Sequence, residues 1–315
     1  MQLDATDKKI LFELDRNCRR TNTDIARRLR INKSIVNYRI KNMLKNGIIE
    51  GFFTVIDTTR LGYQGYKGYF KWHLVNPELE KKMINFLVRN HCVWWAGSID
   101  GEWDLGFVLW TKNIYELRDF WISFMSIYQR HVNRYILTPY TRAYDHSYGF
   151  LNGERKIISQ IGSNQGKVHI NAKAENILRI LGAKARLSET EIARATGYTP
   201  GIVRYQIQKL VRDGVIKGFR AKINSEKIGY CLYKLNLKLK DREKYEEMVQ
   251  YANAHPNIVY MDETVVFADF EVEILVANHI DFQNILKEMR SLFGDEIREV
   301  NYFIYSKIHK IVYFQ

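Results

Sequence analysis

The sequence predicts an α+β fold in which a winged helix-turn-helix is followed by a ferredoxin-like βαββαβ domain, the pair being repeated in tandem. Three observations predict this architecture. The chain contains an internal repeat, each copy opens with three short amphipathic helical patterns, and the rest of each copy alternates strand and helix patterns. The chain has 315 residues, which is more than a single core usually supports.

The repeat emerges when the sequence is compared with itself. A shift of 167 residues aligns Ile10–Tyr66 with Ile177–Tyr233 without a gap, and about twenty of these 57 positions are identical. The similarity continues more weakly further on, where Asp104–Trp110 corresponds to Asp269–Leu275. We therefore expect winged helix-turn-helix domains at 1–55 and 170–222, ferredoxin-like domains at 56–150 and 223–315, and a connector at 151–169.

Capping signals place the helices that open each copy. Thr21 and Asn32 precede the second and third helical patterns of the first copy, and their side chains suit N-caps. Gly47 follows the third pattern and suits the left-handed position beyond a helix end. In the second copy, Ser188 and Glu191 have the spacing of a capping box. Two helices joined by a short turn are typical of a helix-turn-helix.

Strand and helix patterns alternate after these helices. Apolar residues at Ile49, Phe52 and Ile56 predict a short β-hairpin or wing. One face of each ferredoxin-like sheet would be free and lined with aromatic residues, so we expect the other copy to cover it. The predicted strands of the first copy lie at 66–75, 93–99, 103–110 and 134–140, and those of the second at 232–239, 258–264, 270–277 and 297–305. The predicted helices between them lie at 76–87, 113–128, 244–254 and 279–293.

The positive charge is concentrated in the two helical segments. Of the net +13, residues 1–50 carry 12 Lys/Arg against 6 Asp/Glu, and residues 170–220 carry 10 against 4. Each segment therefore has a charge of +6, and the remaining residues contribute +1. Two matched basic segments are the electrostatic pattern of nucleic-acid binding.

Composition excludes several classes of protein. The sequence lacks an apolar stretch long enough to span a bilayer and an apolar signal-peptide core. Its three scattered cysteines suggest a reducing compartment, and we expect a cytoplasmic protein. Walker, GxGxxG, HExxH, GxSxG and CxxC motifs do not occur. We therefore expect no catalytic residue, metal or cofactor.

The segment Thr23–Phe52 resembles the Lrp/AsnC family of transcriptional regulators. It contains a DIA-type second helix at Asp24–Ala26, a Ser-x-Val-x-x-Arg-Ile recognition helix beginning at Ser34, and a Gly-Ile-Ile segment at Gly47–Ile49. Members of this family typically carry one unit per chain and pair their ferredoxin-like domains sheet to sheet. The resemblance thus implies that this chain is a covalent pseudo-dimer, and leaves further homo-oligomerisation open.

The resemblance implies double-stranded DNA as the partner and an amino acid or other small molecule as a candidate effector. The family's Gly-x-x-Asp turn near the effector pocket matches Gly101 and Asp104, whereas the second copy has Val266 in place of the glycine. Because the two recognition helices differ, we expect an asymmetric operator. The residues expected to face DNA are Lys33, Ser34, Asn37, Tyr38, Arg39 and Lys41 in the first copy, and Thr199, Gly201, Arg204, Tyr205 and Gln208 in the second.

Two alternative functions remain open at this stage. Siroheme decarboxylases also resemble Lrp/AsnC proteins, and a fused pair would have this length, although basic recognition helices would then be unexplained. A chromatin protein that binds DNA without sequence preference is the other alternative. The tryptophans at 94, 95, 103 and 110 are interpreted as core residues, with a small-molecule pocket between the sheets as the alternative.

Overall fold

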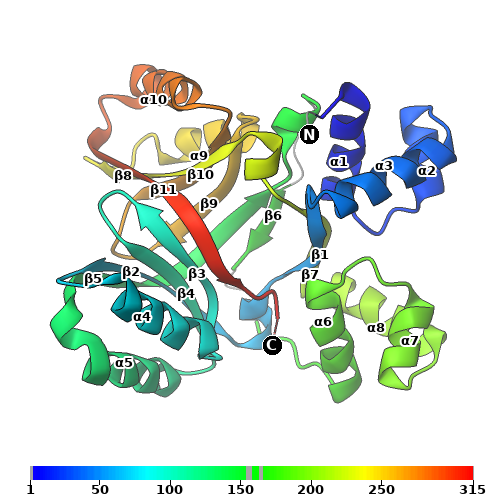
Figure 1. Ribbon diagram of the computed structural model, residues 1–315, viewed down its shortest axis with the longest axis horizontal. Coiled ribbons are helices and arrows are strands. Elements are labelled where there is room, and N and C mark those ends of the chain that lie inside the picture. The colour runs from blue at the N-terminus through cyan, green and yellow to red at the C-terminus, as the bar shows by residue number, and fades with distance from the viewer. Residues whose placement is uncertain (1–2, 154–157, 163–165, 315) are drawn as a thin grey trace.

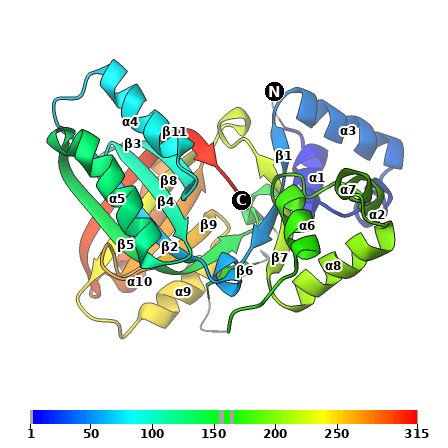
Figure 2. The ribbon, with the colours of Figure 1, turned by 90° about the horizontal axis from the view of Figure 1, so that it is seen from below.

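The computed structural model describes residues 3–153, 158–162 and 166–314. Six helices form two heads on one side of the molecule, and a β-barrel with its covering helices forms the other side (Figure 1, Figure 2). The first head comprises α1 (Ala5–Arg16), α2 (Asn22–Leu29) and α3 (Lys33–Lys45). The second head comprises α6 (Ala172–Ala183), α7 (Glu189–Thr196) and α8 (Pro200–Arg212).

A two-stranded ribbon joins the heads to each other and to the barrel. It pairs β1 (Ile49–Ile56) antiparallel with β7 (Ile216–Ile223), and each strand follows the last helix of its own head. The amide of Cys18 donates to the carbonyl of Phe219 at 2.9 Å, and the equivalent amide of Ala185 donates to Phe52 at 3.1 Å. Each head therefore packs against the ribbon strand of the other copy. The expected boundaries at 55 and 222 fall within these two strands.

The barrel is built from both copies. The first copy contributes β2 (Gln64–Trp72), β3 (Val93–Asp100), β4 (Leu105–Thr111) and β5 (Val132–His146), covered by α4 (Pro77–Arg89) and α5 (Ile114–Tyr128). The second copy contributes β8 (Cys231–Leu239), β9 (Ile258–Thr264), β10 (Phe270–Val276) and β11 (Ile297–Ile311), covered by α9 (Tyr245–Ala254) and α10 (His279–Phe293). Short 3-10 turns lie at Thr58–Leu61, Gln129–His131, Gly149–Leu151 and Glu226–Ile228.

The two sheets join along their edges. Within the described residues the strand order is β2-β4-β3-β11-β8-β10-β9-β5-β6, and pairing of β2 with β5 closes the ring. The long strands β5 and β11 make both junctions, because one half of each pairs within its own copy and the other half pairs with the other copy. Tyr140 lies opposite Thr264 at one junction, and Tyr305 lies opposite Ile99 at the other.

Each head shares its hydrophobic core with the other copy. Ala221 and Ile223 of β7 pack with the buried residues of α1–α3. Ile56 of β1 packs with those of α6–α8. The heads are consequently one packed body with the ribbon rather than independent appendages.

The structure corrects three expectations. The predicted hairpin after Gly47 is instead the single strand β1, because its hydrogen-bonding partner is supplied by the other copy. The last strands of both copies extend well past residues 140 and 305, since their C-terminal halves pair across the junctions. The connector contains a short strand, β6 (Ile158–Ile161), that pairs with β5; other parts of it lie outside the described residues.

Candidate nucleic-acid interface

The recognition helices are α3 and α8, and local capping positions both. The side chain of Asn32 accepts from the amide of Ser34 at 2.9 Å, and the hydroxyl of Thr199 accepts from the amide of Ile202 at 3.3 Å. In α3, Val36, Ile40 and Met43 are buried against α1 and α2. The opposite faces of both helices are consequently open to solvent (Figure 2).

Most of the residues expected to face DNA are exposed on these helices. The two tyrosines at equivalent positions, Tyr38 and Tyr205, are 70% and 56% exposed. Asn37 and Arg39 differ, because both are half-buried and have partners inside the protein. The exposed members are Lys33, Ser34, Tyr38, Lys41, Thr199, Gly201, Arg204, Tyr205 and Gln208.

Arg39 is engaged in an ion-pair network within the first head. Its guanidinium lies 2.6 Å from the carboxylate of Asp4 and 2.9 Å from that of Asp7, which is buried in α1. Asp4 is also the N-cap of α1, so Arg39 fixes α3 to the start of that helix. The charge of Arg39 is thereby compensated inside the head. Its contact with DNA stays a prediction, and a phosphate group would have to compete with Asp4 and Asp7 for the guanidinium.

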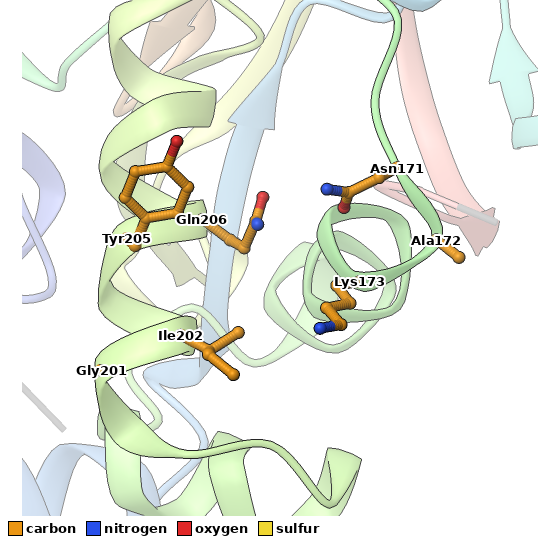
Figure 3. Close-up of a pocket in the computed structure, with 7 residues that line it drawn as sticks. All are labelled: Asn171, Ala172, Lys173, Gly201, Ile202, Tyr205 and Gln206. Carbon is orange, nitrogen blue, oxygen red and sulfur yellow. The ribbon is translucent and has the colours of Figure 1, made fainter.

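The second head lacks this network. Asn171 occupies the position equivalent to Asp4, and Gln206 occupies the position equivalent to Arg39. These two residues line a pocket of about 490 Å³ between α6 and α8 (Figure 3). The Oε1 atom of Gln206 is buried there without a hydrogen-bond partner among the described residues. Loss of the ion pair therefore leaves an incompletely satisfied polar contact beside the second recognition helix.

One further position on each recognition helix contacts the preceding helix. Asn37 accepts from the side-chain amide of Asn22, which in turn accepts from the guanidinium of Arg186 in the second head. At the equivalent position, Arg204 pairs with Glu189 at 2.8 Å, and the two side chains are 61% and 30% exposed. This exposed pair is weak enough for Arg204 to exchange Glu189 for another acceptor.

The Gly-x-x-Asp turn of the first copy has a structural role. The carboxylate of Asp104 accepts from the amide of Trp72 at 2.6 Å and pairs with Lys71 at 2.9 Å. Gly101 has φ +148°, and a Cβ at this position would lie 2.8 Å from the Cβ of Phe303. The aspartate contact recurs in the second copy, where Asp269 accepts from the amide of Leu239 at 2.9 Å. An effector role for Gly101 and Asp104 stays a prediction.

The barrel interior contains buried charges that sequence reasoning missed. Lys67 and Lys234 both contact the carboxylate of Asp262, and Lys67 also lies 2.9 Å from that of Glu271. The two lysines occupy equivalent positions of the repeat inside β2 and β8, which is the signal that could have found them. Burial raises the pKa of Glu273, the third carboxyl group here, against the opposing field of Lys234.

The heads have the fold and surface of winged helix-turn-helix domains, and the barrel is a fused pair of ferredoxin-like sheets. A family model described as winged helix-turn-helix DNA-binding matches residues 3–50 and 170–217. An uncharacterised HTH-type transcriptional regulator of Pyrococcus furiosus is 45% identical over 118 residues, 38% of this chain and 78% of that protein. The HTH-type transcriptional regulator FL11 of Pyrococcus horikoshii is 30% identical over 130 residues, 41% of this chain and 86% of FL11. The regulatory protein AsnC of Haemophilus influenzae is 24% identical over 135 residues, 42% of this chain and 85% of AsnC.

This chain belongs to the Lrp/AsnC family of transcriptional regulators and contains two fused units. Its fold over nearly the full length is similar to that of the siroheme decarboxylase NirDL, with a TM-score of 0.66 and 13% identity, covering 98% of this chain and 93% of NirDL. At this identity the likeness concerns the fold alone. None of the helices in the described part of the chain combines the length and apolar character that a bilayer crossing requires.

Proposed function

We propose that this chain regulates transcription by binding an asymmetric site on double-stranded DNA as a covalent pseudo-dimer. The observation that carries the proposal is the pair of exposed recognition helices, which one ribbon holds on a single body. In a symmetric dimer both helices would read identical half-sites. Here the two helices differ at most of the positions that face outward.

The differences between the helices predict different half-sites. Tyr38 and Tyr205 are shared, whereas Lys41 is replaced by Gln208. Arg204 occupies the position of Asn37; an arginine suits guanine, and an asparagine suits adenine. The half-site read by α8 should therefore depend on a base contact from Arg204, whereas α3 should rely more on phosphate contacts from its lysines.

The test is a titration of fluorescently labelled genomic DNA fragments, followed by anisotropy at increasing KCl concentration. Each phosphate that the protein neutralises should add about 0.9 to the negative slope of log K against log salt. Lys41→Ala should reduce this slope by about one phosphate contact. The matched control is Lys240→Ala, which removes an exposed lysine on the barrel side. A slope near zero contradicts the proposal.

Competition separates regulation from architectural binding. Random-sequence DNA at physiological salt should displace a preferred fragment far less efficiently than the unlabelled fragment itself. Equal displacement would assign the protein to the class that binds DNA without sequence preference.

The fold likeness to NirDL favours one second candidate, a siroheme-decarboxylase-like enzyme. Adding siroheme to the purified protein and recording the Soret band tests it directly. We expect no shift. A shift of the Soret band, together with DNA binding that does not depend on salt, would favour the enzyme over the regulator.

A further inference from the structure

A cavity of about 960 Å³ lies between the ribbon and the barrel. Strands β1 and β7 line one side of it, and strands of both copies line the other. Its wall is rich in aromatic residues, including Trp95, Trp110, Tyr260 and Tyr305. Ile308 of β11 is 45% exposed although it lies on a strand paired within the sheet, because its side chain borders this cavity.

The charges on the barrel side of the cavity do not balance. Lys67 and Lys234 face three carboxylates, those of Asp262, Glu271 and Glu273. Asp262 contacts both lysines, and Glu271 lies 2.9 Å from Lys67, whereas Glu273 lies 3.9 Å from Lys234. With all three carboxyl groups ionised, the cluster carries one negative charge in excess, and Glu273 is its most weakly paired member.

Glu273 is also the most exposed member of this cluster, and it lines the cavity together with Lys67 and Asp262. Its side chain is 20% exposed, whereas the side chains of the other four charged residues are at most 6% exposed. It is one of the cavity-lining residues, and the hydroxyl of Tyr305 lies 3.4 Å from its carboxylate. A carboxylate that is deep in the protein, weakly paired and open to an aromatic cavity is suited to an incoming cation.

A second carboxylate borders the same region. The cross-strand register places Asp145 beside Tyr260, and Tyr260 beside Glu273. Among the described residues, Asp145 shares the cation of Arg220 with Asp15, so with both carboxyl groups ionised this group has one more carboxylate than cation. Within the described part of the chain, two separate clusters thus have one carboxylate more than their cations, and both reach the cavity.

The remaining charged groups that line the cavity lie along the ribbon and β11. Lys222 pairs with Glu50 at 3.0 Å, and Lys310 donates to the carbonyl of Asn90 at 2.8 Å. Glu226, Lys307 and His309 also line it, and His309 contacts the hydroxyl of Ser98 at 2.7 Å. A ligand with several carboxylates would therefore meet Lys307 and Lys310, which pair with no carboxylate among the described residues, but also Glu226 and the two excess negative charges.

We propose that this cavity binds a small organic ammonium ion with an aromatic body, with the ammonium group at Glu273 and the ring against the aromatic wall. Because the ribbon both lines the cavity and packs into the heads, the ligand would be positioned to influence the recognition helices. That last step rests on the proposed function, whereas the binding itself does not.

Isothermal calorimetry without DNA tests the binding, with tryptamine as the probe. Indole-3-acetate has the same ring with the opposite charge, and we expect it to bind at least about tenfold more weakly. Glu273→Gln should weaken tryptamine binding by about tenfold or more, whereas Glu243→Gln, an exposed carboxylate on the barrel surface, should leave it unchanged. Circular dichroism verifies that the variants are folded.

Three results with the two small probes would overturn the proposal. These are absence of tryptamine binding, equal binding of the acetate, and unchanged tryptamine affinity in Glu273→Gln. Iron-uroporphyrin that binds the protein and its Glu273→Gln variant equally well would also contradict it, because a polyanion would then be the ligand. Because the calorimetry experiment contains no DNA, its result tests ligand binding independently of the anisotropy titration, which tests DNA binding.

Discussion

Arg220 connects three parts of the molecule, and its removal should have a large effect. The residue lies on β7, and its Nε and Nη2 atoms donate to one carboxylate oxygen of Asp15 on α1 at 2.9 and 2.6 Å. Its Nη1 atom contacts Asp145 on β5. The side chains of Arg220, Asp15 and Asp145 are 8%, 0% and 14% exposed. One guanidinium therefore fixes the first head and the ribbon to the barrel.

Replacing Arg220 by Met should cost about 3–5 kcal/mol of stability, because the substitution leaves two buried carboxylates without their cation. Arg220→Lys keeps the charge but loses the forked geometry, so its cost should be smaller. The matched control is Lys222→Met, two residues along the same strand. Lys222 pairs with Glu50 at 3.0 Å, and both side chains are 36% exposed, so its removal should cost less than about 1 kcal/mol.

The cost of Arg220→Met should depend on pH. Burial already raises the pKa of Asp15 despite the opposing field of Arg220. A carboxyl group whose pKa is raised on folding binds its proton more tightly in the folded state, so the stability it contributes is lost as pH rises through that pKa. Without Arg220 the pKa of Asp15 should rise further. The penalty should be greatest near neutral pH and should diminish as the pH falls toward the ordinary carboxyl range.

Urea denaturation followed by circular dichroism, at neutral and mildly acidic pH, measures these differences. A penalty for Arg220→Met no larger than that of Lys222→Met would refute the argument that this residue is the junction. A penalty of equal size at both pH values would refute the electrostatic explanation, since lost packing does not titrate.

Three further predictions concern the recognition helices and the cavity. Glu189→Ala releases Arg204 from an exposed ion pair. The affinity for DNA, measured by anisotropy, should increase by about two- to fivefold. An unchanged affinity would mean that Arg204 does not approach DNA. The double variant Gln206→Arg/Asn171→Asp introduces into the second head the ion pair that Arg39 and Asp4 make in the first head. Scanning calorimetry should show that its melting temperature is higher than that of either single variant. Glu273→Gln should stabilise the protein at neutral pH, since burial raises the pKa of Glu273; the gain should disappear in acid, and a destabilised variant would contradict the charge excess.

The helix boundaries could be predicted because their causes are local. Thr21 accepts from the amide of Asp24, and Ser188 and Glu191 form a capping box. Each of these interactions links residues three positions apart, so a single sequence contains both partners. The repeat likewise predicted the exposed positions of α8 from those of α3. Most of the exposed positions on the two recognition helices could therefore be predicted from the sequence.

The strand pairing of the barrel and its buried charges could not be predicted from the sequence, because the interacting residues are not local. Ile49 pairs with Ile223, and Lys67 contacts Asp262, so these partners lie far apart along the chain. Alternation of apolar residues indicates a strand but does not identify the strand beside it. The same limitation applies to Arg39, whose basic side chain suggests a phosphate contact until Asp4 and Asp7 are found next to it.

The interior charges explain why fusing two units extends what the fold can do. The two lysines are equivalent in the repeat, but the positions equivalent to Asp262, Glu271 and Glu273 are Gly97, Gly106 and Val108. A symmetric dimer must repeat every substitution, so its barrel holds an even number of these carboxylates against the two lysines. The number of carboxylates in such a dimer therefore never exceeds the number of lysines by one. Only a chain whose halves diverge can leave one excess carboxylate beside a cavity, and the same freedom permits two recognition helices that read different sequences.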